Sequence, residues 1–170
     1  MPIGYKNGTD GNVTTAINAI QAAAQSHHFL GINKDGFASI VNTTGNPDGH
    51  LVLRGGNNGT NYDENSINTV SQKLLSSSLP EKVMIDCSHG NSNKDYRRQG
   101  IVLREIIKQL RHGSKNILGV MIESHLVEGN QKLTDDLENL KYGQSITDAC
   151  INFDTTQDLL VDLASSVQLT

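Results

Sequence analysis

The chain has 170 residues, of which 36% are hydrophobic and 19% are charged, a composition typical of one globular domain rather than of a disordered segment. Its formal net charge is -4, and no block of lysine or arginine is present, which argues against a nucleic-acid-binding surface. No apolar run approaches the roughly 18 residues of a membrane span, and the first residues lack the apolar stretch of a signal peptide. We therefore expect a single cytoplasmic domain with no membrane partner.

The two cysteines, Cys87 and Cys150, are far apart and show no C-x-x-C spacing. This arrangement argues against both a disulfide framework and a zinc ribbon. We expect both side chains to be buried thiols.

The first part of the chain begins with a strand and a helix and then departs from that alternation. Residues 1–5 form an extended segment, followed by Lys6 and the turn-forming sequence NGTDG. Apolar residues at helical spacing predict an amphipathic helix over residues 12–25. Residues 27–42 predict a β-hairpin around an Asp-Gly pair. Because this hairpin interrupts the alternation, we interpret it as an insertion.

The middle of the chain returns to strands that alternate with helices. The run LVLR ends on Arg54, and a helix is predicted over residues 64–77. The run VMIDCSH ends on His89, and the clearest helical pattern covers residues 94–111. The run GVMIES then carries Glu123 near its end.

The last part of the chain lacks the helix that should follow this strand. Residues 126–143 are polar and contain glycines, which predicts a long functional loop. The run SITDACI follows and carries Asp148. We expect Asp154 to cap a final helix over residues 155–167.

This order of elements predicts an α/β fold with a parallel sheet and right-handed crossovers. Five strand-helix units can be counted, and their strands carry these polar residues: Lys6, Arg54, His89, Glu123 and Asp148. A closed (β/α)8 TIM barrel needs eight units and about 250 residues, so the chain is predicted to be the C-terminal portion of such a barrel. The strands that carry Lys6 and Asp148 would then have open edges, so we expect a homo-oligomer or a pairing with the missing N-terminal half.

The three later strand ends offer one imidazole and two carboxylates, from His89, Glu123 and Asp148. In parallel barrels functional residues lie at the C-terminal ends of the strands. This donor set suits Mn²⁺, Fe²⁺ or Zn²⁺ and leaves coordination positions for a substrate. Two other roles stay open: a histidine at a strand end often makes a structural hydrogen bond, and a carboxylate often caps the next helix.

Two basic residues, Lys6 and Arg54, follow neighbouring strands and together could hold a doubly charged anion. A guanidinium group binds phosphate or carboxylate through two parallel hydrogen bonds, and an ammonium group adds a compact charge. Both side chains could instead be solvated charges at strand ends. A phosphorylated anion beside a carbonyl polarised by a metal would suit carbon-carbon bond formation or cleavage.

Six segments carry a more specific resemblance: GYKNGTDG, HHFLGIN, LVLRGG, MIDCSHGNSNKDYRRQ, GVMIESHLVEGNQ and YGQSITDAC. Together they resemble the C-terminal half of class I 3-deoxy-D-arabino-heptulosonate 7-phosphate (DAHP) synthase, in its aromatic-amino-acid-regulated form, over essentially the whole chain. The resemblance implies a TIM barrel that condenses phosphoenolpyruvate with erythrose 4-phosphate, using a divalent metal. This reaction is the first step of the shikimate pathway of aromatic amino acid biosynthesis.

The resemblance also implies roles for individual residues. Lys6 and Arg54 would bind phosphoenolpyruvate, and the metal ligands would be His89, Glu123 and Asp148. Asp86 would join Lys6 and His89 as a catalytic residue, through contacts to substrate or to a ligand. The hairpin resembles the family's regulatory insertion, where Phe29 would line a pocket for an aromatic amino-acid effector. Gly31 resembles tyrosine-type members, and core packing is the alternative role for Phe29.

The chain departs from the family pattern in two places. The family's fourth metal ligand is a cysteine on the first barrel strand, and a Lys-Pro-Arg-Thr segment that binds both substrates follows on the second strand. Neither feature has a counterpart in this sequence. Cys87 and Cys150 lie in other motifs and do not replace that cysteine. The isolated chain is therefore expected to have little synthase activity. The alternative is a catalytically silent fragment that acts as an assembly or interaction module. A related synthase that uses arabinose 5-phosphate is a poorer match to NGTDG and SHGNSNKDYRRQ.

Overall fold

The computed structural model describes residues 1–167 and is built around a parallel sheet with the strand order β1-β4-β5-β6. The strands of this sheet are β1 (Ile3–Lys6), β4 (Gly49–Leu53), β5 (Val83–Asp86) and β6 (Ile117–Met121). Each neighbouring pair is parallel. The connections run through three helices: α1 (Thr14–Ala24), α2 (Glu64–Ser76) and α3 (Gln99–Arg111). The predicted α/β fold with a parallel sheet is confirmed.

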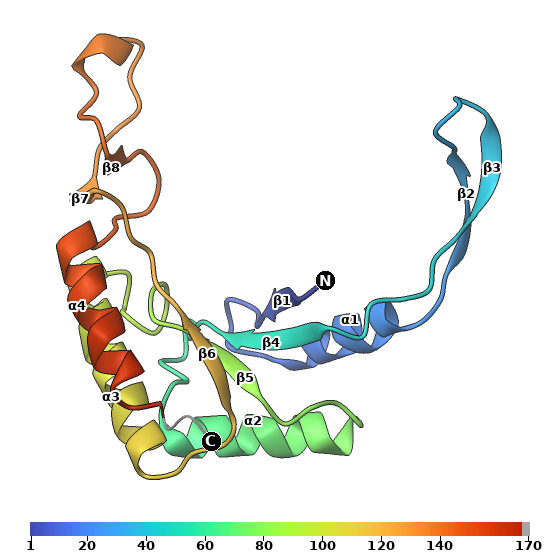
Figure 1. Ribbon diagram of the computed structural model, residues 1–170, viewed down its shortest axis with the longest axis horizontal. Coiled ribbons are helices and arrows are strands. Elements are labelled where there is room, and N and C mark those ends of the chain that lie inside the picture. Colours follow the sequence, from blue (N-terminus) through green and yellow to red (C-terminus); the bar gives the residue numbers. More distant parts are fainter. Residues whose placement is uncertain (168–170) are drawn as a thin grey trace.

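The hydrophobic core lies between the sheet and these helices. Side chains alternate between the two faces of a strand, and Leu51, Leu53 and Ile85 are fully buried on the face that packs against the helices. A fourth helix, α4 (Phe153–Ala164), packs beside α3 and adds Leu159 to this core. In Figure 1, α2, α3 and α4 lie below and to the left of the sheet, and the opposite side is open.

Two helix starts differ from the predicted ones. Helix α4 is capped by Asn152, whose side chain accepts a hydrogen bond from the backbone of Thr155, so the prediction of Asp154 as the cap was wrong. Helix α3 begins five residues later than Lys94, because Lys94 has a left-handed backbone with a φ of 60°. A 3-10 turn, η1 (Tyr96–Arg98), leads into the helix. The polar residues before α3 thereby form a loop at the strand ends.

The fifth predicted strand is not part of the sheet. Asp148 lies in a bend, and Ile151 forms a single parallel bridge to Ser124, just beyond the end of β6. The backbone N-H of Thr147 donates to the hydroxyl oxygen of Ser145, a local turn that prevents an extended run. The open edges of the sheet are consequently β1 and β6, and the prediction of an edge strand carrying Asp148 was wrong.

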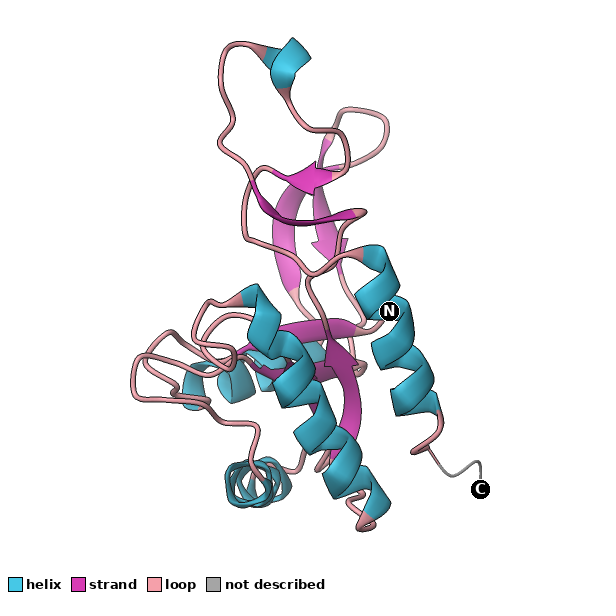
Figure 2. Cartoon of the chain, turned by 90° about the vertical axis from the view of Figure 1, so that its left-hand side faces the viewer, coloured by secondary structure: helices cyan, strands magenta, loops and turns pink. Residues whose placement is uncertain are grey.

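Two arms project from the open side of the molecule (Figures 1 and 2). The first is the predicted hairpin, formed by the antiparallel strands β2 (His28–Ile32) and β3 (Ala38–Asn42). The second contains β7 (Val127–Asn130), the 3-10 turn η2 (Leu137–Asn139) and β8 (Gln144–Ser145). The absence of a helix from this described segment agrees with the predicted loop, but the pairing of β7 with β8 was not predicted.

The two thiols are buried and free, as expected. Burial and the neighbouring charge of Asp86 raise the pKa of Cys87 to about 12. Among residues 1–167, no helix is long and apolar enough to cross a membrane.

Candidate metal centre and anion site

The strand register places four of the predicted site residues on one face of the sheet. Lys6 pairs with Val52, which pairs with Met84 on the other side, so these positions point the same way. Arg54 and Asp86 lie two positions beyond Val52 and Met84. Glu123 lies two positions beyond Met121, the partner of Asp86, so it shares the same face. All therefore lie at the C-terminal ends of the strands, on the face turned away from the helices.

His89 is held at the end of β5 in an uncommon backbone conformation. Its φ of 52° lies in the left-handed region, which a side chain larger than glycine adopts only when its surroundings hold it there. The Nδ1 atom lies 2.9 Å from Oδ2 of Asp86 and 2.7 Å from the hydroxyl oxygen of Ser88. With the proton on Nδ1 facing these acceptors, the lone pair of Nε2 points to the other side, as in metal-binding histidines.

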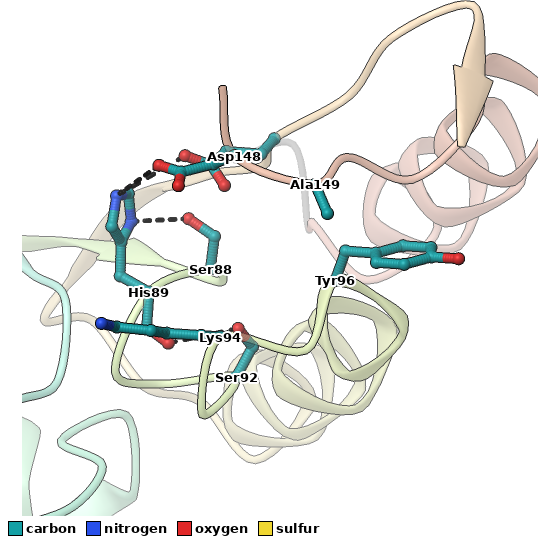
Figure 3. Close-up of a pocket in the computed structure, with 8 residues that line it drawn as sticks. Ser88, His89, Ser92, Lys94, Tyr96, Asp148 and Ala149 are labelled. Atoms are coloured by element: carbon teal, nitrogen blue, oxygen red, sulfur yellow. Dashed lines mark hydrogen bonds and ion pairs between the residues drawn. The ribbon is translucent and has the colours of Figure 1, made fainter. Parts of the chain in front are cut away.

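The Nε2 atom of His89 lies near both predicted carboxylate ligands, and Figure 3 shows the carboxylate of Asp148 beside the imidazole ring. The Nε2 atom lies 3.5 Å from Oε1 of Glu123 and 3.8 Å from Oδ2 of Asp148, and the three ligand atoms all lie within 4.8 Å of one another. Ligands about 2.1 Å from one ion lie about 3.0 to 4.2 Å apart, depending on the angle between them. The two distances from Nε2 of His89 fall in this range, and the three donor types suit one divalent cation. Neither carboxylate caps a helix.

Several carboxylate groups lie close together in this cluster. Burial raises the pKa of Glu123, His89 opposes that shift, and the neighbouring carboxylates of Asp148 and Asp86 add to it. A bound cation would favour the ionised carboxylates and remove this repulsion. A cavity of about 100 Å³ adjoins the cluster and is also lined by Lys94 and Tyr96 (Figure 3).

The anion site is organised around Asp86, which is completely buried. Its Oδ2 atom accepts a hydrogen bond of 2.8 Å from Nζ of Lys6, and its Oδ1 atom accepts from the backbone and the hydroxyl of Ser88. Burial opposes ionisation, but these hydrogen bonds outweigh it and lower the pKa of Asp86. Lys6 is therefore not a freely solvated charge, and it keeps further N-H donors for a ligand.

The side chains of Arg54 and of the hairpin residues make, within residues 1–167, no hydrogen bond or ion pair with the hydrogen-bonded group of Lys6, Asp86 and Ser88. The backbone of Arg54 donates to the side chain of Asn7, while its guanidinium group has no hydrogen bond or ion pair within residues 1–167. Phe29 is 52% exposed, so it does not pack in the core of this chain. The hairpin that carries Phe29 and Gly31 lies well away from β5 and β6 in Figure 1.

Several buried amides around the site were missed in the sequence. The side-chain amide of Asn91 donates to the carbonyls of Leu53 and Asp86 and so joins the ends of β4 and β5. The amide of Asn7 donates to the carbonyl of Gly55 and so joins β1 to the loop after β4. Polar residues directly after apolar strands are the only signal that could have pointed to them.

The parallel α/β sheet carries, at the ends of its strands, a cluster of metal-ligand residue types and a lysine-aspartate pair. This arrangement defines a protein with a candidate site at the carboxyl edge of the sheet, where ligands bind in such folds. The family described as "DAHP synthetase I family" matches residues 1–161, and the chain belongs to this family. The resemblance inferred from the six segments is confirmed.

Individual relatives agree with this assignment. The chain is 48% identical over 168 residues to "Phospho-2-dehydro-3-deoxyheptonate aldolase, Tyr-sensitive" of Enterobacter agglomerans, covering 99% of this chain and 78% of the relative. It is 48% identical over 163 residues to the protein of the same name from Escherichia coli K12, covering 96% of this chain but 46% of the relative. The solved structure of phospho-2-dehydro-3-deoxyheptonate aldolase from Francisella tularensis SCHU S4 superposes with a TM-score of 0.90 at 46% identity, over 98% of this chain and 48% of that one. The chain thus spans about half the length of the latter two.

Proposed function

We propose that this chain is the C-terminal, metal-binding portion of a DAHP synthase, which condenses phosphoenolpyruvate with erythrose 4-phosphate in the cytoplasm. The observation that carries this proposal is the convergence of Lys6, Asp86 and the metal cluster on one edge of a parallel sheet. Membership of the DAHP synthetase I family identifies the reaction to be tested.

In this proposal, His89, Glu123 and Asp148 hold a divalent cation such as Mn²⁺, Fe²⁺ or Zn²⁺. The cation would act as a Lewis acid on the carbonyl oxygen of the aldehyde substrate. Lys6 and Arg54 would bind the phosphate and carboxylate of phosphoenolpyruvate, because they follow adjacent strands and point to the same face.

Asp86 links these two parts of the site. One of its oxygens lies 2.8 Å from Nζ of Lys6 and 2.9 Å from Nδ1 of His89. It therefore orients the ammonium group toward the anion and keeps the Nδ1 proton of His89 away from the cluster. Asp86 is the residue through which a change at the anion site would reach the metal ligand.

We further propose that the sheet is part of a (β/α)8 barrel that is incomplete without additional strands. Within residues 1–167, β1 and β6 each have one neighbouring strand in this sheet, so each has an open edge, which favours a homo-oligomer or a pairing with an N-terminal half. The metal ligand and the Lys-Pro-Arg-Thr segment that the resemblance expects are absent from this sequence. The chain alone should therefore have little activity.

The hairpin is proposed as the regulatory arm. Phe29 is half exposed, and a side chain at Gly31 would come within 2.9 Å of Val41 and 3.6 Å of the Phe29 ring. A glycine there leaves the surface beside Phe29 open to an aromatic amino acid, with tyrosine favoured by the resemblance.

The test is the consumption of phosphoenolpyruvate with erythrose 4-phosphate and Mn²⁺, for the chain alone and for a fusion. The fusion joins the part of the Escherichia coli relative that this chain does not match to the 170 residues of the chain. We expect no turnover for the chain alone and turnover for the fusion. In the fusion, Lys6→Ala should abolish turnover. Lys82→Ala should leave turnover unchanged, because Lys82 precedes β5 and so lies at the end of the sheet opposite the site.

Two results would contradict the proposal. Turnover by the chain alone near a typical kcat of about 10 s⁻¹ would refute the incomplete barrel. A folded fusion that binds Mn²⁺ but consumes no phosphoenolpyruvate would support the silent assembly module instead.

A further inference from the structure

The buried side chain of Gln99 pairs with both backbone groups of Glu123. Gln99 is the first residue of α3 and is 0% exposed. Its Oε1 atom accepts a hydrogen bond of 2.8 Å from the backbone N-H of Glu123, and its Nε2 atom donates one of 3.0 Å to the backbone carbonyl of Glu123. The carboxamide of Gln99 thus makes with Glu123 the two backbone hydrogen bonds that a neighbouring strand would make.

Glu123 needs such a partner because the sheet ends before it. The last paired residues of β5 and β6 are Asp86 and Met121, and the next backbone bond joins the N-H of Cys87 to the carbonyl of Met121. Beyond this point β5 turns away toward His89. The only other backbone bond to Glu123 comes, within residues 1–167, from the N-H of Ile151 to its carbonyl.

We propose that Gln99 is a positioning residue that sets the place of the Glu123 carboxylate relative to Nε2 of His89. Two hydrogen bonds from one planar group hold the N-H before and the carbonyl after the Cα atom of Glu123, and so fix the position and orientation of its backbone, as a β-bridge does. Since Glu123 is one of the three cluster residues, its backbone position decides whether the ligand atoms converge. The inference rests on the metal site of the proposed function and deepens it.

The same helix offers a matched control. Gln109 is also buried, at 4% exposure, and its Nε2 atom donates to the carbonyl of Tyr62 at 2.9 Å. It lies ten positions further along the sequence, and its Oε1 atom has no hydrogen-bond partner among the described residues. Gln109→Met therefore removes a buried glutamine from α3 that makes no hydrogen bond to Glu123. Methionine matches glutamine in length and lacks its strong donor and acceptor groups.

The first experiment is a Mn²⁺ titration of the parent chain, Gln99→Met and Gln109→Met, with thermal unfolding recorded for each. We expect Gln99→Met to weaken Mn²⁺ binding by about tenfold to 100-fold, the usual effect of removing a group that orients a ligand. Gln109→Met should stay within about twofold of the parent affinity. Equal affinities for all three folded chains would overturn the inference. A parent chain that binds no Mn²⁺ would instead contradict the metal site.

The second experiment needs neither the metal nor a folded variant. Amide hydrogen exchange of the metal-free parent chain compares the N-H of Glu123, bonded to Gln99, with that of Ser124, for which no acceptor is present among residues 1–167. We expect the Glu123 amide to be protected and the Ser124 amide to exchange rapidly. Equally rapid exchange of both would overturn the positioning role of Gln99, whatever the metal titration shows.

Discussion

Lys6 and Asp86 form an ion pair of 2.8 Å across an intervening strand, since β4 lies between β1 and β5 in the sheet. The Asp86 side chain is fully buried, and the same carboxylate oxygen lies 2.9 Å from Nδ1 of His89. A buried charge of this kind is tolerated only when it is paired and hydrogen-bonded. The pair therefore ties the anion site to the metal cluster in one network.

This network predicts the effect of Asp86→Asn on metal binding. The variant keeps the size of the side chain but removes the charged acceptor for Nδ1 of His89. We expect Mn²⁺ affinity to fall by about tenfold or more, because a ligand histidine loses basicity without such a partner. Asp95→Asn, which removes an exposed pair with Arg97, is the control in the same titration. Similar affinities for the two variants would show that Asp86 does not act on the cluster.

The start of α2 predicts a measurable dependence of stability on pH. Asp63 caps this helix by accepting from the backbone and the hydroxyl of Ser66. Burial alone would raise the pKa of Asp63, but these hydrogen bonds outweigh it and lower the pKa. The stabilisation is thus complete above the unfolded pKa of about 3.9 and is lost as the pH falls through the folded value.

Urea unfolding of the parent chain, Asp63→Asn and Asp63→Ala measures this effect. At pH 7, Asp63→Ala should lower the free energy of unfolding by about 1 kcal/mol, since alanine cannot cap the helix. Asp63→Asn keeps a capping oxygen but carries no charge. The difference in the free energy of unfolding between the parent and this variant should therefore shrink as the pH falls below about 4. A stability of the parent relative to Asp63→Asn that increases as the pH falls would contradict this account.

The regulatory role of the hairpin predicts separate effects on stability and inhibition. Phe29 is half exposed, so Phe29→Ala should change the free energy of unfolding by less than about 1 kcal/mol. In the active fusion, the same variant should remove inhibition by tyrosine, measured as phosphoenolpyruvate consumption with and without tyrosine. Phe37→Ala, at the more exposed end of the hairpin, is the control. Unchanged inhibition in Phe29→Ala would remove Phe29 from the effector site.

The four strands of the sheet could be predicted because each is a short apolar run followed by a polar residue. The ends of parallel strands meet at one edge of a sheet, so Lys6, Arg54 and Glu123 were expected together there, and the register agrees. The run around Asp148 looked the same in sequence, but a local turn at Ser145 diverts it from the sheet. Asp148 still reaches the cluster, because the bridge at Ile151 brings this loop beside β6.

The supporting amides could not be predicted, for a physical reason. Asn91 and Gln99 bond to backbone groups of other strands, 38 and 24 residues away in sequence. No periodicity marks such a contact, since its partner is a peptide group that every residue carries. The cap of α4 was misplaced by two residues because Asn152 and Asp154 are both good capping residues, and only the backbone conformation distinguishes them.

The most direct test of the metal centre is calorimetric titration of Mn²⁺ into the parent chain, His89→Ala and His112→Ala. His112 lies at the C-terminal end of α3, outside the cluster, and serves as the control. We predict one site in the parent and in His112→Ala, with binding by His89→Ala weakened by about tenfold or more. Equal heats and affinities for all three chains would mean that His89 is a structural histidine and that the proposed metal centre is wrong.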